Sequence, residues 1–226
     1  VAQTLGDLAR ERWHRATGQP LTSPGHFSPP PDLWPSWIDP DMHNVDVAIS
    51  RTLPAYEDRP GVYEIQQLYI DAIKTARHVI YLENQFLTSH IIQKALAECL
   101  QDPDGPEILI LLRRDGGDWL EQMTMDVLRT RVLGQMTHAD RYNRLFIAYP
   151  DGPALHEHCL GLHSKVMIVD DAFIRIGSAN LTNRSMALDS ECDLAIAAND
   201  RQDLRDAITK FRQRLLAEHL GMSESE

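Results

Sequence analysis

One stretch of this 226-residue chain, from Leu162 to Ile196, constrains the fold more than any other. It begins with an HxKxxxxD pattern made by His163, Lys165 and Asp170, and the residues between them include the apolar run Val166 to Val169. A short, wholly apolar run of this kind predicts a buried strand. Because side chains alternate along a strand, His163 and Lys165 are expected to project from the same face.

Two further strands are predicted directly after this one. Ala172 to Ile176 leads into a Gly-Ser-Ala-Asn turn that carries Ser178 and Asn180, and Glu191 precedes the apolar segment Cys192 to Ile196. We expect the hydroxyl and amide of the turn to lie close to the imidazole and ammonium of the first strand. The stretch therefore predicts adjacent strands with a group of polar side chains at one end.

This group of side chains has a consistent chemical interpretation. An imidazole can act as a nucleophile or a proton donor near neutral pH. Lysine, serine and asparagine together offer donors to an anion whose charge is spread over several oxygens, such as a phosphoryl group being transferred. A carboxylate such as that of Glu191 could hold the imidazole of His163 in one tautomer.

The same stretch resembles the signature of the phospholipase D superfamily. The HxKxxxxD pattern is followed at the family's spacing by Gly-Ser-x-Asn, by the run Asn183 to Met186 and by Glu191. The resemblance implies an α/β fold, a phospholipase D-like α-β-α sandwich in which a mixed sheet has helices on both faces.

The resemblance also implies roles for individual residues. His163 matches the histidine of the family's second motif and is expected to act as a general acid or base, while Lys165 and Asn180 hold phosphate oxygens with help from Ser178. Glu191 is expected to hydrogen-bond His163. Asp170, at the far end of its strand, is expected to be a structural ion-pair partner and not to act in catalysis.

A second motif, Tyr81 to Phe86, lies at the end of a predicted strand, where α/β sheets place their ligands. It resembles a segment that lines the active site in phospholipases D of the eukaryotic type. We therefore expect Glu83, Asn84 and Gln85 to contribute to substrate binding. The alternative is a polar strand exit that only leads into the next helix.

The order of the predicted elements agrees with an α/β sheet. The sequence pattern predicts strands at Val45–Arg51, His78–Leu82, Glu107–Leu112 and Arg144–Tyr149, and helices at Gly61–Arg77, Thr88–Leu100, Trp119–Leu133 and Asp203–Leu220. The signature strands follow the fourth of these strands.

The first part of the chain differs in composition. Val1 to Thr17 has helical spacing of its apolar residues, and Gln19 to Asp41 is rich in proline, which excludes regular structure and favours an extended connector. We expect residues 1–44 to be a remnant helix of an N-terminal half plus a linker, in which Trp34 and Trp37 anchor the connector or line an entrance. Residues 45–226 are expected to form a C-terminal phospholipase D-like domain.

The sequence contains one HxK pattern, whereas the family's chemistry uses two. In the family, the histidine of one half forms a phosphohistidine and the histidine of the other half protonates the leaving alcohol. The resemblance therefore implies a partner for this chain: either a missing N-terminal half or a second copy in a homodimer.

Composition restricts the partners further. The formal net charge is −11, from 22 basic and 33 acidic side chains, whereas proteins that grip nucleic acid usually present a basic face. No extended nucleic-acid surface is expected.

No apolar run approaches the roughly 20 residues of a membrane span, and the three cysteines suggest reduced thiols. We expect a cytoplasmic protein that can sit peripherally at a membrane.

A zinc site is the main chemical alternative. His156, His158, Cys159 and His163 fall within one short segment and include ligand types that zinc accepts. Neighbouring residues such as His158 and Cys159 point apart on an extended chain, however, and a ligating His163 would be lost to catalysis. The expectation is a site that needs no metal and no cofactor.

These observations predict a phosphodiesterase of the phospholipase D type, which hydrolyses or transfers phospholipid headgroups. A nuclease, a cardiolipin synthase-like transferase, and a non-catalytic half-domain that binds a phosphorylated ligand or a partner subunit are the alternatives.

Overall fold

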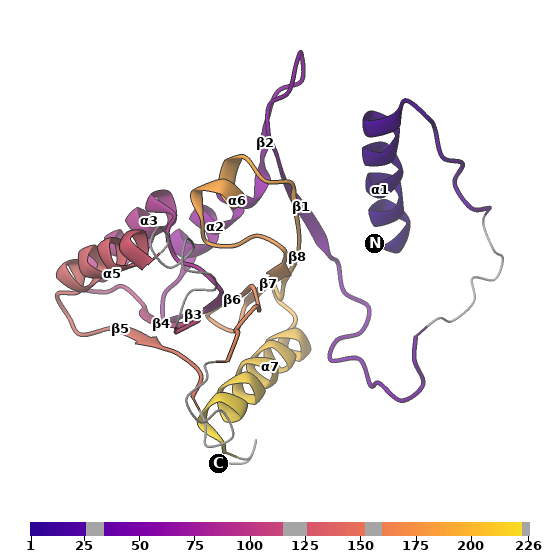
Figure 1. Ribbon diagram of the computed structural model, residues 1–226. Helices are drawn as coiled ribbons and strands as arrows, with labels where there is room; N and C mark the ends of the chain where they lie inside the picture. Colours follow the sequence, from indigo (N-terminus) through magenta and orange to yellow (C-terminus); the bar gives the residue numbers. More distant parts are fainter. Residues whose placement is uncertain (26–33, 115–125, 152–159, 223–226) are drawn as a thin grey trace. The chain divides into compact units, whose positions relative to one another are not determined.

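The computed structural model describes residues 1–25, 34–114, 126–151 and 160–222 (Figure 1). The chain divides into two units, Val1–His43 and Asn44–Glu226. The first unit contains helix α1 (Ala2–Thr17), which confirms the helix predicted there. Gly18 ends this helix in the left-handed conformation, with φ of 71°, and its N–H donates to the carbonyl of His14.

The described part of the second unit is built on one mixed sheet of eight strands, in the order β2-β1-β8-β7-β6-β3-β4-β5. Strands β3, β4 and β5 run parallel to one another, and all other neighbours are antiparallel. The strands are β1 (Ala48–Leu53), β2 (Val62–Tyr63), β3 (Val79–Asn84), β4 (Glu107–Leu112), β5 (Leu145–Ala148), β6 (Val166–Val169), β7 (Phe173–Gly177) and β8 (Glu191–Ala197).

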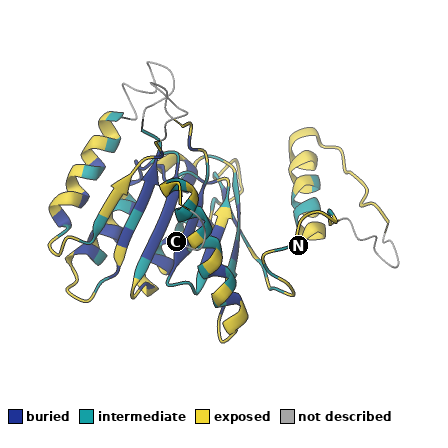
Figure 2. Ribbon diagram, turned by 90° about the horizontal axis from the view of Figure 1, so that it is seen from below, coloured by how far each residue is buried: buried dark blue, intermediate teal, exposed yellow. Residues whose placement is uncertain are grey.

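Helices cover both faces of this sheet, which confirms the predicted α-β-α arrangement (Figures 1 and 2). Helices α2, α3 and α5 lie over one face, with α3 packed against both others, and α7 lies over the opposite face. The helices of this unit are α2 (Glu64–Thr75), α3 (His90–Gln101), α5 (Val127–Ala139), the short α6 (Asn183–Ala187) and α7 (Gln202–Leu220). None of the helices in the described ranges is long and apolar enough to cross a membrane.

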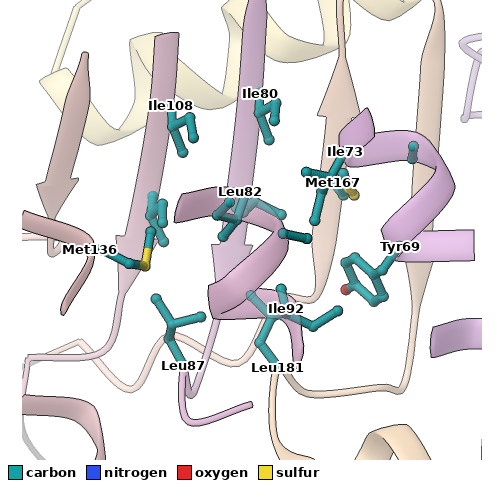
Figure 3. Close-up of a cluster of buried hydrophobic side chains, with 14 of the residues drawn as sticks. Tyr69, Ile73, Ile80, Leu82, Leu87, Ile92, Ile108, Met136, Met167 and Leu181 are labelled. Atoms are coloured by element: carbon teal, nitrogen blue, oxygen red, sulfur yellow. The ribbon is translucent and has the colours of Figure 1, made fainter. Parts of the chain in front are cut away.

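The main hydrophobic core lies between the sheet and helices α2, α3 and α5. Alternate residues of β3 and β6 face it, because side chains of a strand alternate between the two faces. Figure 3 shows Tyr69, Ile73, Ile80, Leu82, Leu87, Ile92, Ile108, Met136, Met167 and Leu181 gathered in this layer. The intervening residues of the same strands are therefore left to face α7.

Two predicted elements differ from the structure. The first strand runs from Ala48 to Leu53, and the helix predicted from Gly61 begins only at Glu64. The reason is that Val62 and Tyr63 pair with the end of β1 as strand β2. The Glu64 carboxylate also accepts from the backbone N–H and the guanidinium of Arg51, which fixes the start of α2.

The helix predicted at Trp119–Leu133 starts in residues outside the described ranges. Its described part, α5, continues beyond the predicted end to Ala139 because Met136 and Ala139 are buried on the core side. Helix α6 was not predicted. It is one short turn held by the Thr182 hydroxyl, which accepts from the Ser185 N–H at 3.1 Å.

A buried ion pair lies within the sheet on the side of α2. Arg175 of β7 is 1% exposed and Asp193 of β8 is fully buried. The Arg175 Nε donates to the Asp193 carboxylate at 2.7 Å, and the guanidinium lies 4.6 Å from the ring centroid of Tyr69. Gly177 leaves room for this pair, because a Cβ there would overlap the Asp193 carboxylate.

Replacing Asp193 by alanine is predicted to cost about 3–5 kcal/mol of unfolding free energy, because it leaves the guanidinium of Arg175 buried without its counter-ion. Urea unfolding of the variant and the wild type measures this loss. The matched control is Asp189→Ala, which breaks the exposed Arg184–Asp189 pair and should change stability little. Equal stability losses in the two variants would contradict the importance of the buried pair.

Candidate active site

The side chains of His163 and Lys165 lie together, as the strand periodicity predicts. The Lys165 Nζ is 3.1 Å from the His163 Nδ1 and donates to the carbonyl oxygen of His163 at 2.9 Å. His163 is exposed, whereas Lys165 is only 7% exposed. The site thus combines an accessible imidazole with a sheltered ammonium group.

Burial is the main influence on the Lys165 ammonium. It lowers the pKa of this side chain, the positive charge of Arg175 lowers it further, and the nearby carboxylate of Glu191 opposes the shift. The backbone of Lys165 is held as well, because its carbonyl oxygen accepts from Arg175 Nη1 and from the Gly177 N–H, each at 3.2 Å. A buried cation with this support is suited to bind an anion.

The turn after β7 places Ser178 beside Glu191. The Ser178 hydroxyl donates to the Glu191 carboxylate and also accepts from the Cys192 N–H at 3.0 Å. The expected hydrogen bond from Glu191 to His163 does not form. The Glu191 Oε2 accepts from the Ser178 hydroxyl, and the side-chain partner of His163 is Lys165.

Asn180 sits at the end of this turn with its amide oxygen buried and, among the described residues, without a hydrogen-bond partner. The turn itself is fixed on both sides of Asn180. The Asp193 carboxylate accepts from the Ala179 N–H at 3.2 Å, and the Asn84 Oδ1 accepts from the Leu181 N–H at 3.1 Å. The backbone on both sides of Asn180 is thus fixed, while its buried Oδ1 has no hydrogen-bond partner among the described residues.

Asn84 itself was expected to bind substrate. The structure buries it, at 1% exposed, and its hydrogen bonds go to protein groups: its Oδ1 also accepts from the Phe86 N–H, and its Nδ2 donates to the carbonyl of Ala179 at 3.5 Å. Asn84 therefore supports the turn that carries Asn180. Gln85, the next residue, is half-buried.

The segment after β3 and the segment after β7 are joined by the backbone. Leu87 and Leu181 form a parallel bridge, and the carbonyl of Leu181 accepts from the N–H groups of Thr88 and Ser89 at 2.8 and 2.9 Å. The side chain of Asn183 adds a contact to the Thr88 carbonyl at 3.5 Å. We call residues 84–89 and 179–183 the paired segments.

Glu83 lies on the other face of the sheet, toward α7, and is 2% exposed. Its carboxylate contacts Tyr81, Ser164 and His219. These contacts give it a supporting position instead of the substrate contact that the motif suggests. Sequence reasoning missed His219, because 136 residues separate it from Glu83 and no local pattern marks it.

Asp170 is structural, as expected, but its partners are different. Its carboxylate accepts from the backbone N–H groups of Arg77, His78 and Val79 at 2.6 to 2.8 Å, which secures the start of β3. These backbone N–H groups take the place of the ion-pair partner that the sequence suggests. His156, His158 and Cys159 of the zinc alternative lie outside the described residues, and the expectation of a metal-free site stays a prediction.

Comparison with known proteins agrees with this geometry. The family model described as "Cardiolipin synthase, PLD-like domain" matches residues 69–215, which is more than half of the chain. The chain belongs to the phospholipase D superfamily. The matched residues include both motifs singled out above, from the Glu83 segment through the HxKxxxxD strand to Glu191.

The first three individual relatives that match this chain are phospholipases D. Phospholipase D alpha 1 of Cynara cardunculus is 27% identical over 225 residues, covering 70% of this chain and 28% of its own length. The chain spans between 12% and 30% of the length of the first three curated relatives it matches.

Two solved structures share the fold of this chain. Nuc from Salmonella typhimurium, a phospholipase D family member, aligns with a TM-score of 0.52 at 17% identity, covering 75% of this chain and 92% of that one. Phosphatidylserine synthase from Haemophilus influenzae aligns with a TM-score of 0.57, also at 17% identity, covering 76% of this chain and 38% of that one.

The burial of Lys165 predicts an effect on stability. Because the folded state lowers its pKa, the unfolded chain holds the proton more tightly, and the charged ammonium disfavours folding at neutral pH. Stability should therefore rise with pH between the lowered folded-state pKa and the ordinary lysine value. Lys165→Met should raise the unfolding temperature at pH 7 and remove this rise.

Thermal unfolding between pH 7 and pH 11 tests the prediction. Lys94→Met is the matched control, since Lys94 is an exposed lysine of α3 whose replacement should leave the pH dependence in place. A lower unfolding temperature in Lys165→Met at pH 7 would contradict the conclusion that its charge is unfavourable in the folded state.

Proposed function

We propose that this chain provides one half of a phosphodiesterase site of the phospholipase D type, acting on phospholipid headgroups. The contact between the His163 imidazole and the sheltered Lys165 ammonium carries the proposal, because it places a proton-transfer group beside an anion-binding group. The membership of the superfamily supports it, and so do the names of the relatives, several of which are phospholipases D.

In this proposal Lys165 and Asn180 bind the non-bridging oxygens of the phosphate. The position of Asn180 supports this role, since Arg175 donates to the carbonyls of both Lys165 and Ala179 and so holds the segments that carry Lys165 and Asn180 together. Ser178 contributes less, because its hydroxyl is already engaged with Glu191. Glu191 in turn supplies negative charge close to Lys165, which opposes the lowering of the Lys165 pKa by burial.

His163 acts as the general acid and base. A histidine from the other half attacks phosphorus, so that a P–N bond forms while the P–O bond to the leaving alcohol breaks and His163 gives that alcohol its proton. His163 then takes a proton from water or a second alcohol, which attacks phosphorus and displaces the histidine. The covalent intermediate divides one difficult displacement into two easier steps.

Phospholipid is favoured over nucleic acid as the substrate. The formal net charge of −11 disfavours a surface that follows a phosphate backbone. The family description names cardiolipin synthase, and one structural neighbour is a phosphatidylserine synthase. A transferase that uses an alcohol in place of water in the second step fits the same residues.

Replacing His163 by asparagine should reduce turnover by about 10² to 10⁴, which is the contribution typical of general acid–base groups. The measurement compares release of headgroup from phosphatidylcholine and phosphatidylglycerol vesicles with cleavage of single-stranded DNA, in the presence of chelator. His78→Asn, which changes an exposed histidine outside the site, is the matched control.

Three results would overturn parts of the proposal. Near-full activity of His163→Asn would remove His163 from the mechanism. Cleavage of DNA but not of the lipids would identify a nuclease. Loss of activity with chelator that zinc restores would favour the zinc alternative.

Activity is predicted to require a second HxK histidine, because the one HxK strand of this sequence supplies only one side of the phosphorus. Analytical ultracentrifugation together with the lipid assay tests this. We expect activity from a two-fold dimer with both His163 side chains in one site, or from a mixture with a separate N-terminal half that carries its own HxK motif. A monomer with full activity by itself would contradict the prediction.

A further inference from the structure

The carboxylate of Glu83 is the centre of a buried polar cluster that the proposed chemistry does not use. Its Oε1 accepts from the Tyr81 hydroxyl at 2.5 Å and lies 3.0 Å from the His219 Nε2, and its Oε2 accepts from the Ser164 hydroxyl at 2.5 Å. Glu83 and Tyr81 are nearly fully buried. A buried carboxylate requires such partners, because an unpaired charge in this position would be very unfavourable.

The position of Ser164 connects this cluster to the active site. Ser164 lies between His163 and Lys165, just before β6, and its hydroxyl contacts Glu83 on the side of the sheet that faces α7. The neighbouring strand β3 is in register to meet it, since Glu83 pairs with Val166. The hydrogen bond from Ser164 to Glu83 thus holds the backbone from which both His163 and Lys165 project.

His219 brings the last turn of helix α7 into the same cluster. Its side chain is 14% exposed and its ring approaches Glu83 over the face of the sheet that α7 covers. Burial, reinforced by Glu83, raises the pKa of the Tyr81 hydroxyl, so Tyr81 remains a hydrogen-bond donor. Arg212 and Glu218 of α7 also act on Tyr81, with opposite charges.

We propose that Glu83 is a positioning residue for the active site: through Ser164 it fixes the backbone between His163 and Lys165, and through His219 it makes helix α7 part of the site's support. The predicted effect on turnover rests on the proposed function, whereas the predicted effect on the position of the His163 ring does not. The sequence motif that contains Glu83 then holds the segment with His163 and Lys165 from the side of the sheet that faces α7.

The physical reason is that proton transfer and phosphate binding depend strongly on geometry. A misplacement of about 1 Å at a catalytic group can cost on the order of a hundred-fold in rate. Without the Glu83 carboxylate, Ser164 loses its acceptor and the segment before β6 is held mainly by contacts on the other face. The expected consequence is a lower turnover number with little change in substrate affinity at the phosphate pocket.

Five variants test the positioning role of Glu83: Glu83→Gln, Ser164→Ala, the double variant, and His219→Ala with His219→Gln as its conservative partner. We expect Glu83→Gln and Ser164→Ala each to lower kcat about ten-fold or more with KM within two-fold. The glutamine amide has one acceptor oxygen where the carboxylate offers one each to the Tyr81 and Ser164 hydroxyls, so both variants weaken the same contact and the double variant should fall no further. His219→Gln keeps a side-chain N–H donor and should recover most of the activity lost in His219→Ala. Gln213→Ala, on an exposed part of α7, is the control.

A readout independent of turnover is the imidazole NMR spectrum of His163, assigned with His163→Asn, in the presence and absence of inorganic phosphate. Glu83→Gln and Ser164→Ala should shift the His163 ring signals, and Gln213→Ala should not. If the wild type neither cleaves lipid nor responds to phosphate, the proposed function fails, and the ring signals still decide the positioning role.

Unchanged kcat and unchanged His163 signals in Ser164→Ala and in His219→Ala would overturn the inference, even if Glu83→Gln fails to fold. Additive losses of kcat in the double variant would also overturn it, since separate effects would then explain the two single variants. A loss of stability with normal kcat per folded molecule would reduce Glu83 to a structural role and equally contradict the proposal.

Discussion

The ion pair between Arg175 and Asp193 is the interaction on which the rest of the site depends. The guanidinium reaches the carbonyl oxygens of both Lys165 and Ala179, at 3.2 Å each, and the Asp193 carboxylate accepts from the Ala179 N–H. One buried pair therefore fixes the strand that carries the ammonium group and the turn that carries the amide. Its desolvation is costly, and such pairs are retained where they specify a conformation that apolar packing would leave open.

Strand β6 and the residues before it are supported from both faces. On the side of α2, Lys165 is held near Arg175, and on the side of α7, Ser164 is held by Glu83. The alternation of a strand makes this possible, because neighbouring residues serve different layers. The catalytic geometry is thus a property of the whole sandwich and not of the HxK motif alone.

The sequence predicted the sandwich and the neighbourhood of His163 and Lys165 because these depend on local periodicity and spacing. It did not predict that Ser178 is the hydrogen-bond partner of Glu191, since Ser178 and His163 could both donate to this carboxylate and only the backbone geometry decides which of them comes within reach. The sequence also did not predict the contact of Glu83 with His219. When two residues in contact are so far apart in the sequence, no periodic pattern in either segment indicates the contact.

The paired segments, residues 84–89 and 179–183, have a consequence for how such enzymes diversify. Their backbones are bonded to each other at Leu181, so a change in the length of one would displace the other and with it Asn180. Recombination that exchanges only one of the two between relatives would join mismatched halves of a single surface. Any exchange of these segments with those of a relative therefore requires that both be exchanged together, since they form one unit made of two separate parts of the sequence.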